Sequence, residues 1–172
     1  MATNLHFIKE FNSTASMSNA SLTDCFTDEY DVYQLHLNNV APSADGKYLR
    51  VRFTESGTAN TTSNYDYAQL FLYTSGTLEL PGVNGDKVNI NNHTNGTGTS
   101  ETTNGIYTIF NANDSSEYTQ MLTESVNLDS SAGVYGSPGG IVFTVASAVD
   151  GVSLYYDSGN IATGTFTLYR VT

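Results

Sequence analysis

The chain has 172 residues, of which 39% are hydrophobic and 13% charged, and its formal net charge is −11. A chain of this length fits one domain, here residues 1–172, and buries roughly 70% of its unfolded surface, so it needs neither a metal nor a disulfide to fold. The acidic excess argues against nucleic acid and anionic membranes as partners, because both carry dense negative charge.

The first third of the chain contains three predicted strands. Apolar and polar residues alternate at residues 5–9, 32–37 and 48–53, which is typical of half-buried strands. His6 and His36 lie inside these patterns and His93 lies apart from both, so we expect three structural histidines and no catalytic cluster. The first ten residues have no basic region and no long apolar run, which predicts no secretory signal and synthesis in a cytoplasm.

Asp24, Asp28, Glu29 and Asp31 form an acidic cluster between the first two of these strands. Hard cations such as calcium prefer several converging carboxylates, but this spacing does not match a calcium loop. We interpret the cluster as a solvated turn, and the sequence leaves open whether it binds a cation. Cys25 is the only cysteine, so it forms no internal disulfide, and we expect a small buried core residue.

The middle of the chain contains further predicted strands at residues 65–73, 105–111, 117–127 and 140–147. In the segment 65–73 both faces could be covered, which predicts a position near the centre of a sheet. A helix competes at 117–127, but Thr119, Thr123 and Ser125 favour a strand. The stretch 91–105 has no apolar residue, so we expect an exposed loop that contributes nothing to the core and either contacts a neighbouring subunit or faces solvent.

The last 23 residues predict two strands, 151–156 and 164–171, joined by the turn Ser158-Gly159-Asn160. We expect the final strand to close a sheet. About eight to ten strands, with polar turns between them and no periodic helix, predict an all-β antiparallel two-sheet sandwich of the jelly-roll kind.

The sequence contains no nucleophile elbow, zinc-protease pair, P-loop or dinucleotide fingerprint. Two carboxylates for glycoside cleavage could still meet from distant strands, but nothing singles out a pair. We therefore predict no catalytic residue, no cofactor-binding residue, no metal ligand and no cofactor, and expect the protein not to be an enzyme.

Several short motifs occur in a shared order along the chain. They are Leu5-His6-Phe7-Ile8-Lys9-Glu10, Phe26-Thr27-Asp28-Glu29-Tyr30-Asp31-Val32-Tyr33, Leu49-Arg50-Val51-Arg52-Phe53, Ser63-Asn64-Tyr65-Asp66-Tyr67-Ala68 and Ser158-Gly159-Asn160-Ile161-Ala162-Thr163-Gly164-Thr165-Phe166. Together they resemble the small β-sandwich structural proteins of marine and cyanobacterial tailed bacteriophages. The resemblance implies a virion location and supplies no catalytic residue.

Three functions follow as hypotheses. The first is a non-enzymatic capsid decoration or cement protein, a homo-oligomer such as a trimer, bound to the major capsid protein or another virion protein. The alternative is a tail fibre or receptor-binding module that contacts host glycans. A sandwich-fold glycan hydrolase ranks third. A surface rich in Tyr, Thr and Asn suits protein partners, because it combines aromatic contacts with adaptable hydrogen bonds.

Overall fold

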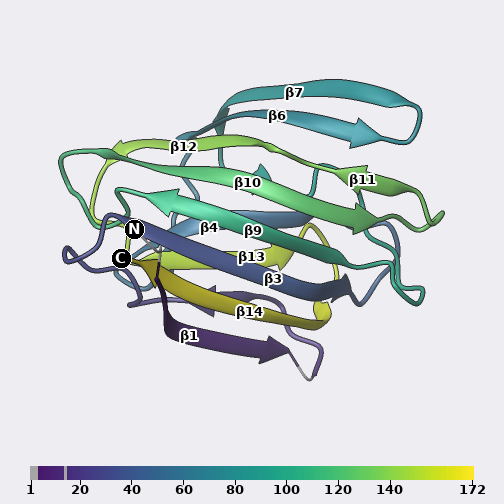
Figure 1. Ribbon diagram of the computed structural model, residues 1–172, viewed down its shortest axis with the longest axis horizontal. Helices are drawn as coiled ribbons and strands as arrows, with labels where there is room; N and C mark the ends of the chain where they lie inside the picture. The colour runs from purple at the N-terminus through teal and green to yellow at the C-terminus, as the bar shows by residue number, and fades with distance from the viewer. Residues whose placement is uncertain (1–3, 14) are drawn as a thin grey trace.

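The computed structural model describes residues 4–13 and 15–172. Within these residues it contains fourteen strands and no helix, and the strands form antiparallel sheets of nine and five strands (Figure 1). The predicted all-β sandwich is confirmed. Since the described residues form no helix, none of them forms a helical segment able to cross a membrane.

Eight strands form a jelly roll, because the first four and the last four each alternate between the two sheets and every one of the first four pairs with one of the last four. The pairs are β1 with β14, β2 with β13, β3 with β9 and β4 with β8. Contacts of β14 with β3 and of β13 with β4 join these pairs into two sheets. In chain order the strands are β1 (Leu5–Ser13), β2 (Ala20–Leu22), β3 (Val32–Pro42), β4 (Leu49–Glu55), β8 (Val88–Asn89), β9 (Thr103–Phe110), β13 (Gly151–Tyr156) and β14 (Ile161–Val171).

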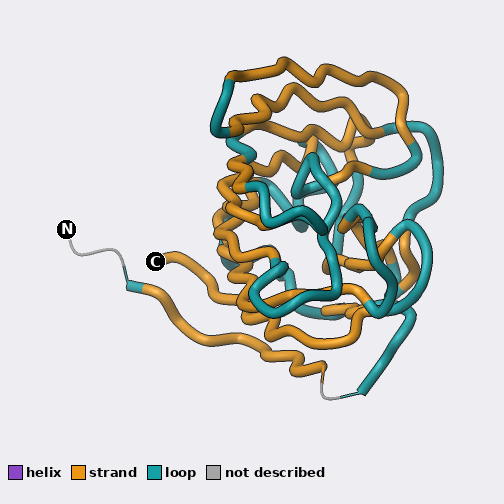
Figure 2. The backbone as a smooth tube through the Cα atoms, turned by 90° about the vertical axis from the view of Figure 1, so that its right-hand side faces the viewer, coloured by secondary structure: helices purple, strands orange, loops and turns teal. Residues whose placement is uncertain are grey.

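Two insertions enlarge this jelly roll. The first adds β5 (Thr58–Ala59), β6 (Tyr65–Tyr73) and β7 (Gly76–Gly85), and the second adds β10 (Tyr118–Leu128), β11 (Val134–Gly136) and β12 (Gly139–Ala146). β5 joins the small sheet, and the other five extend the large sheet beyond β9. Turned by 90°, the large sheet forms a curved wall, and the small sheet and the loops lie on its inner side (Figure 2).

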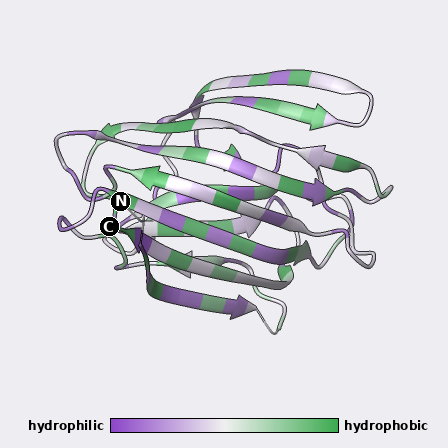
Figure 3. Cartoon of the chain, in the orientation of Figure 1, coloured by the Kyte–Doolittle hydropathy of each residue, from purple (hydrophilic) through white to green (hydrophobic). Residues whose placement is uncertain are grey.

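The core lies between the two sheets, where alternate residues of each strand point inward. In β3 the buried residues Tyr33, Leu35 and Leu37 alternate with half-buried ones, as predicted, and β4 buries Leu49, Val51 and Phe53 in the same way. Figure 3 shows the resulting change of hydropathy from residue to residue along the strands. Cys25 is 5% exposed and belongs to this core, as expected, and its burial raises the pKa of its thiol.

Most predicted strands occur in the structure, and ten of the fourteen strands are six residues or longer. The strand preference at 117–127 is confirmed by β10. The predicted strands 151–156 and 164–171 are also present, as β13 and β14. They do not pair with each other, because the turn between them carries the chain from the small sheet to the large one. β14 lies between β1 and β3 and is therefore an interior strand.

The structure corrects the placement of residues 65–73. β6 is not near the sheet centre, because only β7 lies beyond it. Its inward residues Tyr65, Gln69 and Phe71 are buried, whereas Leu70 points to the outer face and is only half-buried. The alternating pattern assigns the residues of β6 to the correct two faces. Only one of these faces is covered by the rest of the protein, whereas the sequence predicted that both could be.

Strand β7 was missed because its sequence contains Pro81 and several glycines, which are rare in central strands. Here β7 pairs with β6 alone, so it is an edge strand. A proline is tolerated there because no second neighbour needs its missing amide hydrogen.

The expectation that the stretch 91–105 stays outside the core was wrong. Asn91, Asn95 and Thr103 are completely or almost completely buried. Asn91 Nδ2 donates to Asn95 Oδ1 at 2.7 Å, and so does the hydroxyl of Thr103, also at 2.7 Å, while the Tyr156 hydroxyl lies 3.3 Å from the same oxygen. Asn91, Asn95 and Thr103 can enter the core because the fold pairs them with one another.

Candidate interaction surface

The outer face of the large sheet, on the side away from the small sheet, carries exposed apolar side chains on neighbouring strands. Ile106 of β9 is 43% exposed, and Leu122 and Val126 of β10 are 53% and 46% exposed. Apolar side chains that cluster on a surface mark binding sites more often than single ones do. We call the part of this face on β3, β9, β10 and β12 the outer sheet surface.

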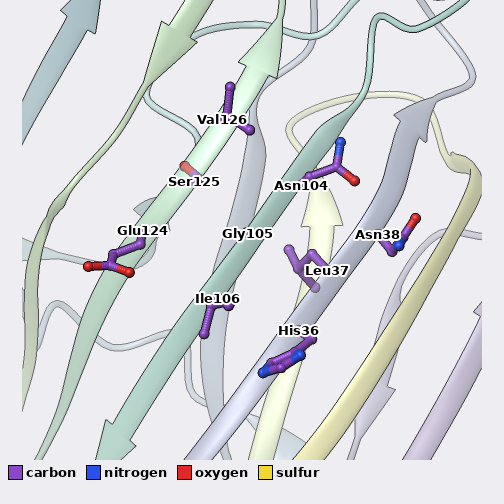
Figure 4. Close-up of a pocket in the computed structure, with 9 residues that line it drawn as sticks. All are labelled: His36, Leu37, Asn38, Asn104, Gly105, Ile106, Glu124, Ser125 and Val126. Carbon is purple, nitrogen blue, oxygen red and sulfur yellow. The ribbon is translucent and has the colours of Figure 1, made fainter.

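One hollow of about 490 Å³ lies across β3, β9 and β10 (Figure 4). Its floor is the backbone of Leu37, Gly105 and Ser125, which form one cross-strand row. The side chains of Leu37 and Ser125 point inward, since Leu37 is buried and the Ser125 hydroxyl donates to the carbonyl of Ile90 at 3.3 Å. This row therefore presents only backbone to solvent.

Side chains of the adjacent rows form the walls of this hollow. One wall contains His36, Ile106 and Glu124, which are cross-strand neighbours, and the other contains Asn104 and Val126 (Figure 4). The walls thus combine aliphatic side chains, which a binding partner can cover, with amide and carboxylate groups that can form hydrogen bonds.

Gly105 is required by the packing beneath this hollow. A Cβ atom at position 105 would lie 2.8 Å from the Glu124 carbonyl oxygen and 2.9 Å from the ring of Tyr107. The Tyr107 ring is completely buried and covers the inner side of Gly105, so this side chain closes the sheet where the glycine has none.

A second hollow of about 330 Å³ lies beside the first, between β9, β10 and β12. Phe110, Leu122 and Val142 line it, and Gly140 forms part of its floor. A Cβ atom at Gly140 would have no neighbour within 4 Å. Both hollows lie on the exposed face of the sheet, where a partner surface can cover their apolar side chains. The outer sheet surface therefore suits a protein partner.

The histidines take separate places, as expected. His36 lies on the outer sheet surface, 3.2 Å from Gln34 and with its ring centroid 4.9 Å from that of Tyr169, and burial lowers its pKa. His6 is exposed on β1. His93 stacks on Tyr135 at 4.0 Å and lies 3.6 Å from the Asp129 carboxylate, beneath the extension of the large sheet.

The acidic cluster lies in the connection from β2 to β3. Asp24, Asp28, Glu29 and Asp31 are all exposed, which agrees with a solvated turn. Asp28 and Asp31 line a cleft of about 320 Å³ together with Asp114 of a distant loop. Across residues 4–13 and 15–172, no three His, Cys, Asp or Glu side chains converge to form a metal site.

The fold and the outer sheet surface define a class: an extended jelly roll with an open face suited to another protein. Comparison with known proteins adds no relative, because neither a protein-family model nor a curated protein matches the chain.

Proposed function

We propose that this protein is a non-enzymatic structural protein of a bacteriophage virion, bound to the outside of the capsid as a decoration or cement protein. The observation that carries the proposal is the open outer sheet surface with its group of exposed apolar side chains. The ordered motifs that resemble phage β-sandwich proteins supply the virion context, and such a protein is made in the host cytoplasm.

In this proposal the outer sheet surface docks on the major capsid protein or on another virion protein. Burial of Ile106, Leu122 and Val126 stabilises the complex by about 25 cal/mol for each Å² of apolar surface removed from water. Glu124 beside them and the net charge of −11 favour a neutral or basic partner surface. Assembly as a homo-oligomer, for which a trimer is one option, would present several such faces to the shell.

The decisive experiment adds the purified protein to particles that lack it and measures co-sedimentation. Leu122→Glu places a charge at the centre of the outer sheet surface and is expected to abolish attachment. Leu78→Glu is the matched control, because Leu78 is equally exposed, at 53%, but lies on β7. Equal attachment of both variants would contradict docking through this face, and no attachment of the native protein would contradict the decoration role.

The alternative role is a tail fibre or receptor-binding module that contacts host glycans. A cationic cleft on the opposite side of the molecule, described below, favours this alternative. A virion reconstruction or immunogold labelling distinguishes the two, and protein found only on the tail would refute decoration. A glycan hydrolase would release reducing sugar from host polysaccharide, and robust release would overturn the non-enzymatic proposal.

A further inference from the structure

Three of the six Lys and Arg residues of this acidic chain lie together beside the small sheet. Arg50 and Arg52 are on the outer side of β4, and Lys87 precedes β8, which pairs with β4. A cleft of about 200 Å³ opens here, between these strands and the hairpin formed by β6 and β7. We call it the Arg50 cleft. It has room for roughly seven waters, or for one small ligand.

Arg52 has a structural role in this cluster. Its Nε donates to the Asp86 carbonyl at 2.8 Å and its Nη2 to the Asp86 carboxylate at 2.8 Å, while its guanidinium lies 5.0 Å from the centre of the Tyr155 ring. The other carboxylate oxygen of Asp86 accepts from Lys87. This bond and the bonds from Arg52 hold the pKa of Asp86 below its ordinary value. Asp86 is therefore neutralised by its two cationic neighbours.

Arg50 differs from Arg52 because the two terminal nitrogens of its guanidinium remain open to a ligand. Its Nε donates to Asn89 Oδ1 at 3.1 Å, which fixes the plane of the guanidinium. Its Nη2 forms an ion pair with Asp157, 3.9 Å from Oδ2 and beyond hydrogen-bond distance, while the other oxygen, Oδ1, accepts the amides of Tyr48 and Ser158. The terminal nitrogens of Arg50 form no hydrogen bond to the described residues. An oriented guanidinium whose terminal nitrogens are not hydrogen-bonded is suited to bind a ligand carboxylate with two parallel hydrogen bonds.

The opposite wall of the cleft is Tyr67 of β6. A Cβ atom at Gly82 would clash with the Tyr67 ring, so the ring rests directly on the bare backbone of β7. The amide nitrogen of Asn89 is a further donor, since its oxygen already accepts from Arg50. The lining thus combines a cation, an aromatic ring and an amide, and Val83 is its one aliphatic side chain.

We propose that the Arg50 cleft binds a saccharide unit that carries one carboxylate, of the hexuronic acid class. Arg50 holds the carboxylate, and Tyr67 and Asn89 contact the ring and its hydroxyl groups. The positive charges of Arg50, Arg52 and Lys87 exceed the negative charges of Asp86 and Asp157 by one. Because the whole chain has a formal net charge of −11, it would repel a polyanion. This inference does not depend on capsid attachment, which uses the other side of the sandwich.

The test is a titration of the ¹⁵N-labelled protein with sodium glucuronate, followed by amide chemical shifts. We expect glucuronate to shift the amides of Arg50 and of residues 82–89, and glucose and acetate to bind at least tenfold more weakly, because each lacks half of the recognised groups. Arg50→Gln is expected to weaken binding by roughly tenfold or more, as the loss of charged hydrogen bonds predicts. The control Lys9→Gln removes a cation that contacts Thr23 instead, and is expected to bind as the native protein does.

Arg50→Lys keeps the charge and removes the fork, so it tests recognition even if Arg50→Gln fails to fold. Retained affinity in Arg50→Lys would overturn bidentate binding. Equal shifts with acetate or inorganic sulfate would contradict a saccharide as the ligand. The absence of any shift with glucuronate would contradict the Arg50 cleft as a binding site. Capsid attachment is measured separately, so either proposal can fail alone.

Discussion

At the scale of single residues, the core contains one aromatic cluster and one polar cluster besides its aliphatic side chains. Phe143 is fully buried, and its ring centroid lies 5.0 Å from that of Tyr65 and 6.0 Å from that of Phe53. In the polar cluster, Asn95 accepts hydrogen bonds from Asn91 and Thr103 and donates one to the carbonyl of Leu128. Both clusters link residues far apart in the chain.

Replacement of Phe143 by Ala is expected to lower the free energy of unfolding by about 3–5 kcal/mol, because it leaves a cavity that the two neighbouring rings cannot fill. Leu70→Ala is expected to lower it by about 1 kcal/mol or less, since Leu70 is only half-buried on the outer face. Urea denaturation measures both. Equal losses would contradict the assigned orientation of β6.

Replacement of Asn95 by Ala removes the oxygen that accepts from the Asn91 amide and from the Thr103 and Tyr156 hydroxyls. Asn91 keeps an acceptor in Thr103 Oγ1 and Tyr156 keeps one in the Val40 carbonyl, both at 3.3 Å. The buried Thr103 hydroxyl loses its acceptor, which is expected to cost about 1–3 kcal/mol, so thermal stability should fall. The exposed Asn19→Ala is the control and should melt as the native chain does. A small effect at Asn95 would mean that residues 91–103 do not form part of the core in solution.

At the scale of elements, the two glycines of the outer sheet surface have opposite requirements. Gly105 of β9 has backbone and the Tyr107 ring where a side chain would lie, and Gly140 of β12 has open space there. The difference follows from alternation, because a Cβ at Gly105 points into the sandwich and a Cβ at Gly140 points out of it.

Gly105→Ala is therefore expected to displace Tyr107 and to lower the free energy of unfolding by about 1–3 kcal/mol, as overpacked sites do. Gly140→Ala is expected to leave stability within about 0.5 kcal/mol of the native value. Thermal unfolding of the two variants distinguishes them. Under the proposed function Gly140→Ala also narrows the second hollow, so particle attachment should weaken without loss of stability.

At the scale of the whole molecule, the acidic charge makes stability depend on pH. Burial by itself raises the pKa of Asp129, but the amides of Gly133 and Ser131, the Tyr135 hydroxyl and nearby His93 outweigh burial and hold the pKa below its ordinary value of 3.8. Because the folded state holds this proton less tightly than the unfolded state, Asp129 stabilises the fold above pH 3.8, and the contribution is lost as the pH falls below that value.

The Asp129→Asn variant keeps an acceptor oxygen and removes the charge. We expect it to be less stable than the native chain near neutral pH, and the difference to shrink below pH 3.8. Urea unfolding at a series of pH values between 6 and 2.5 measures this. A difference that stays constant over the series would show that the Asp129 carboxylate makes no charge-dependent contribution.

Local pattern was sufficient to predict much of this fold. Alternation predicted the strands at 65–73 and 151–156, and the intrinsic preference of Thr119, Thr123 and Ser125 predicted the strand at 117–127. Both signals depend only on residues close together in the chain. The same pattern predicted the burial of Tyr33 and Leu35. It missed β7, whose Pro81 and glycines are acceptable only because no strand pairs on its outer edge.

The sequence by itself determined the class of fold, the acidic surface and the buried place of Cys25, since each follows from composition or from short-range pattern. Only the tertiary structure decided which face of β6 is covered, which asparagines enter the core and which glycine tolerates a side chain. It also brought Arg50, Tyr67 and Lys87 into one cleft. The physical reason is that burial and convergence depend on partners from distant segments, and side-chain alternation contains no information about which segments meet.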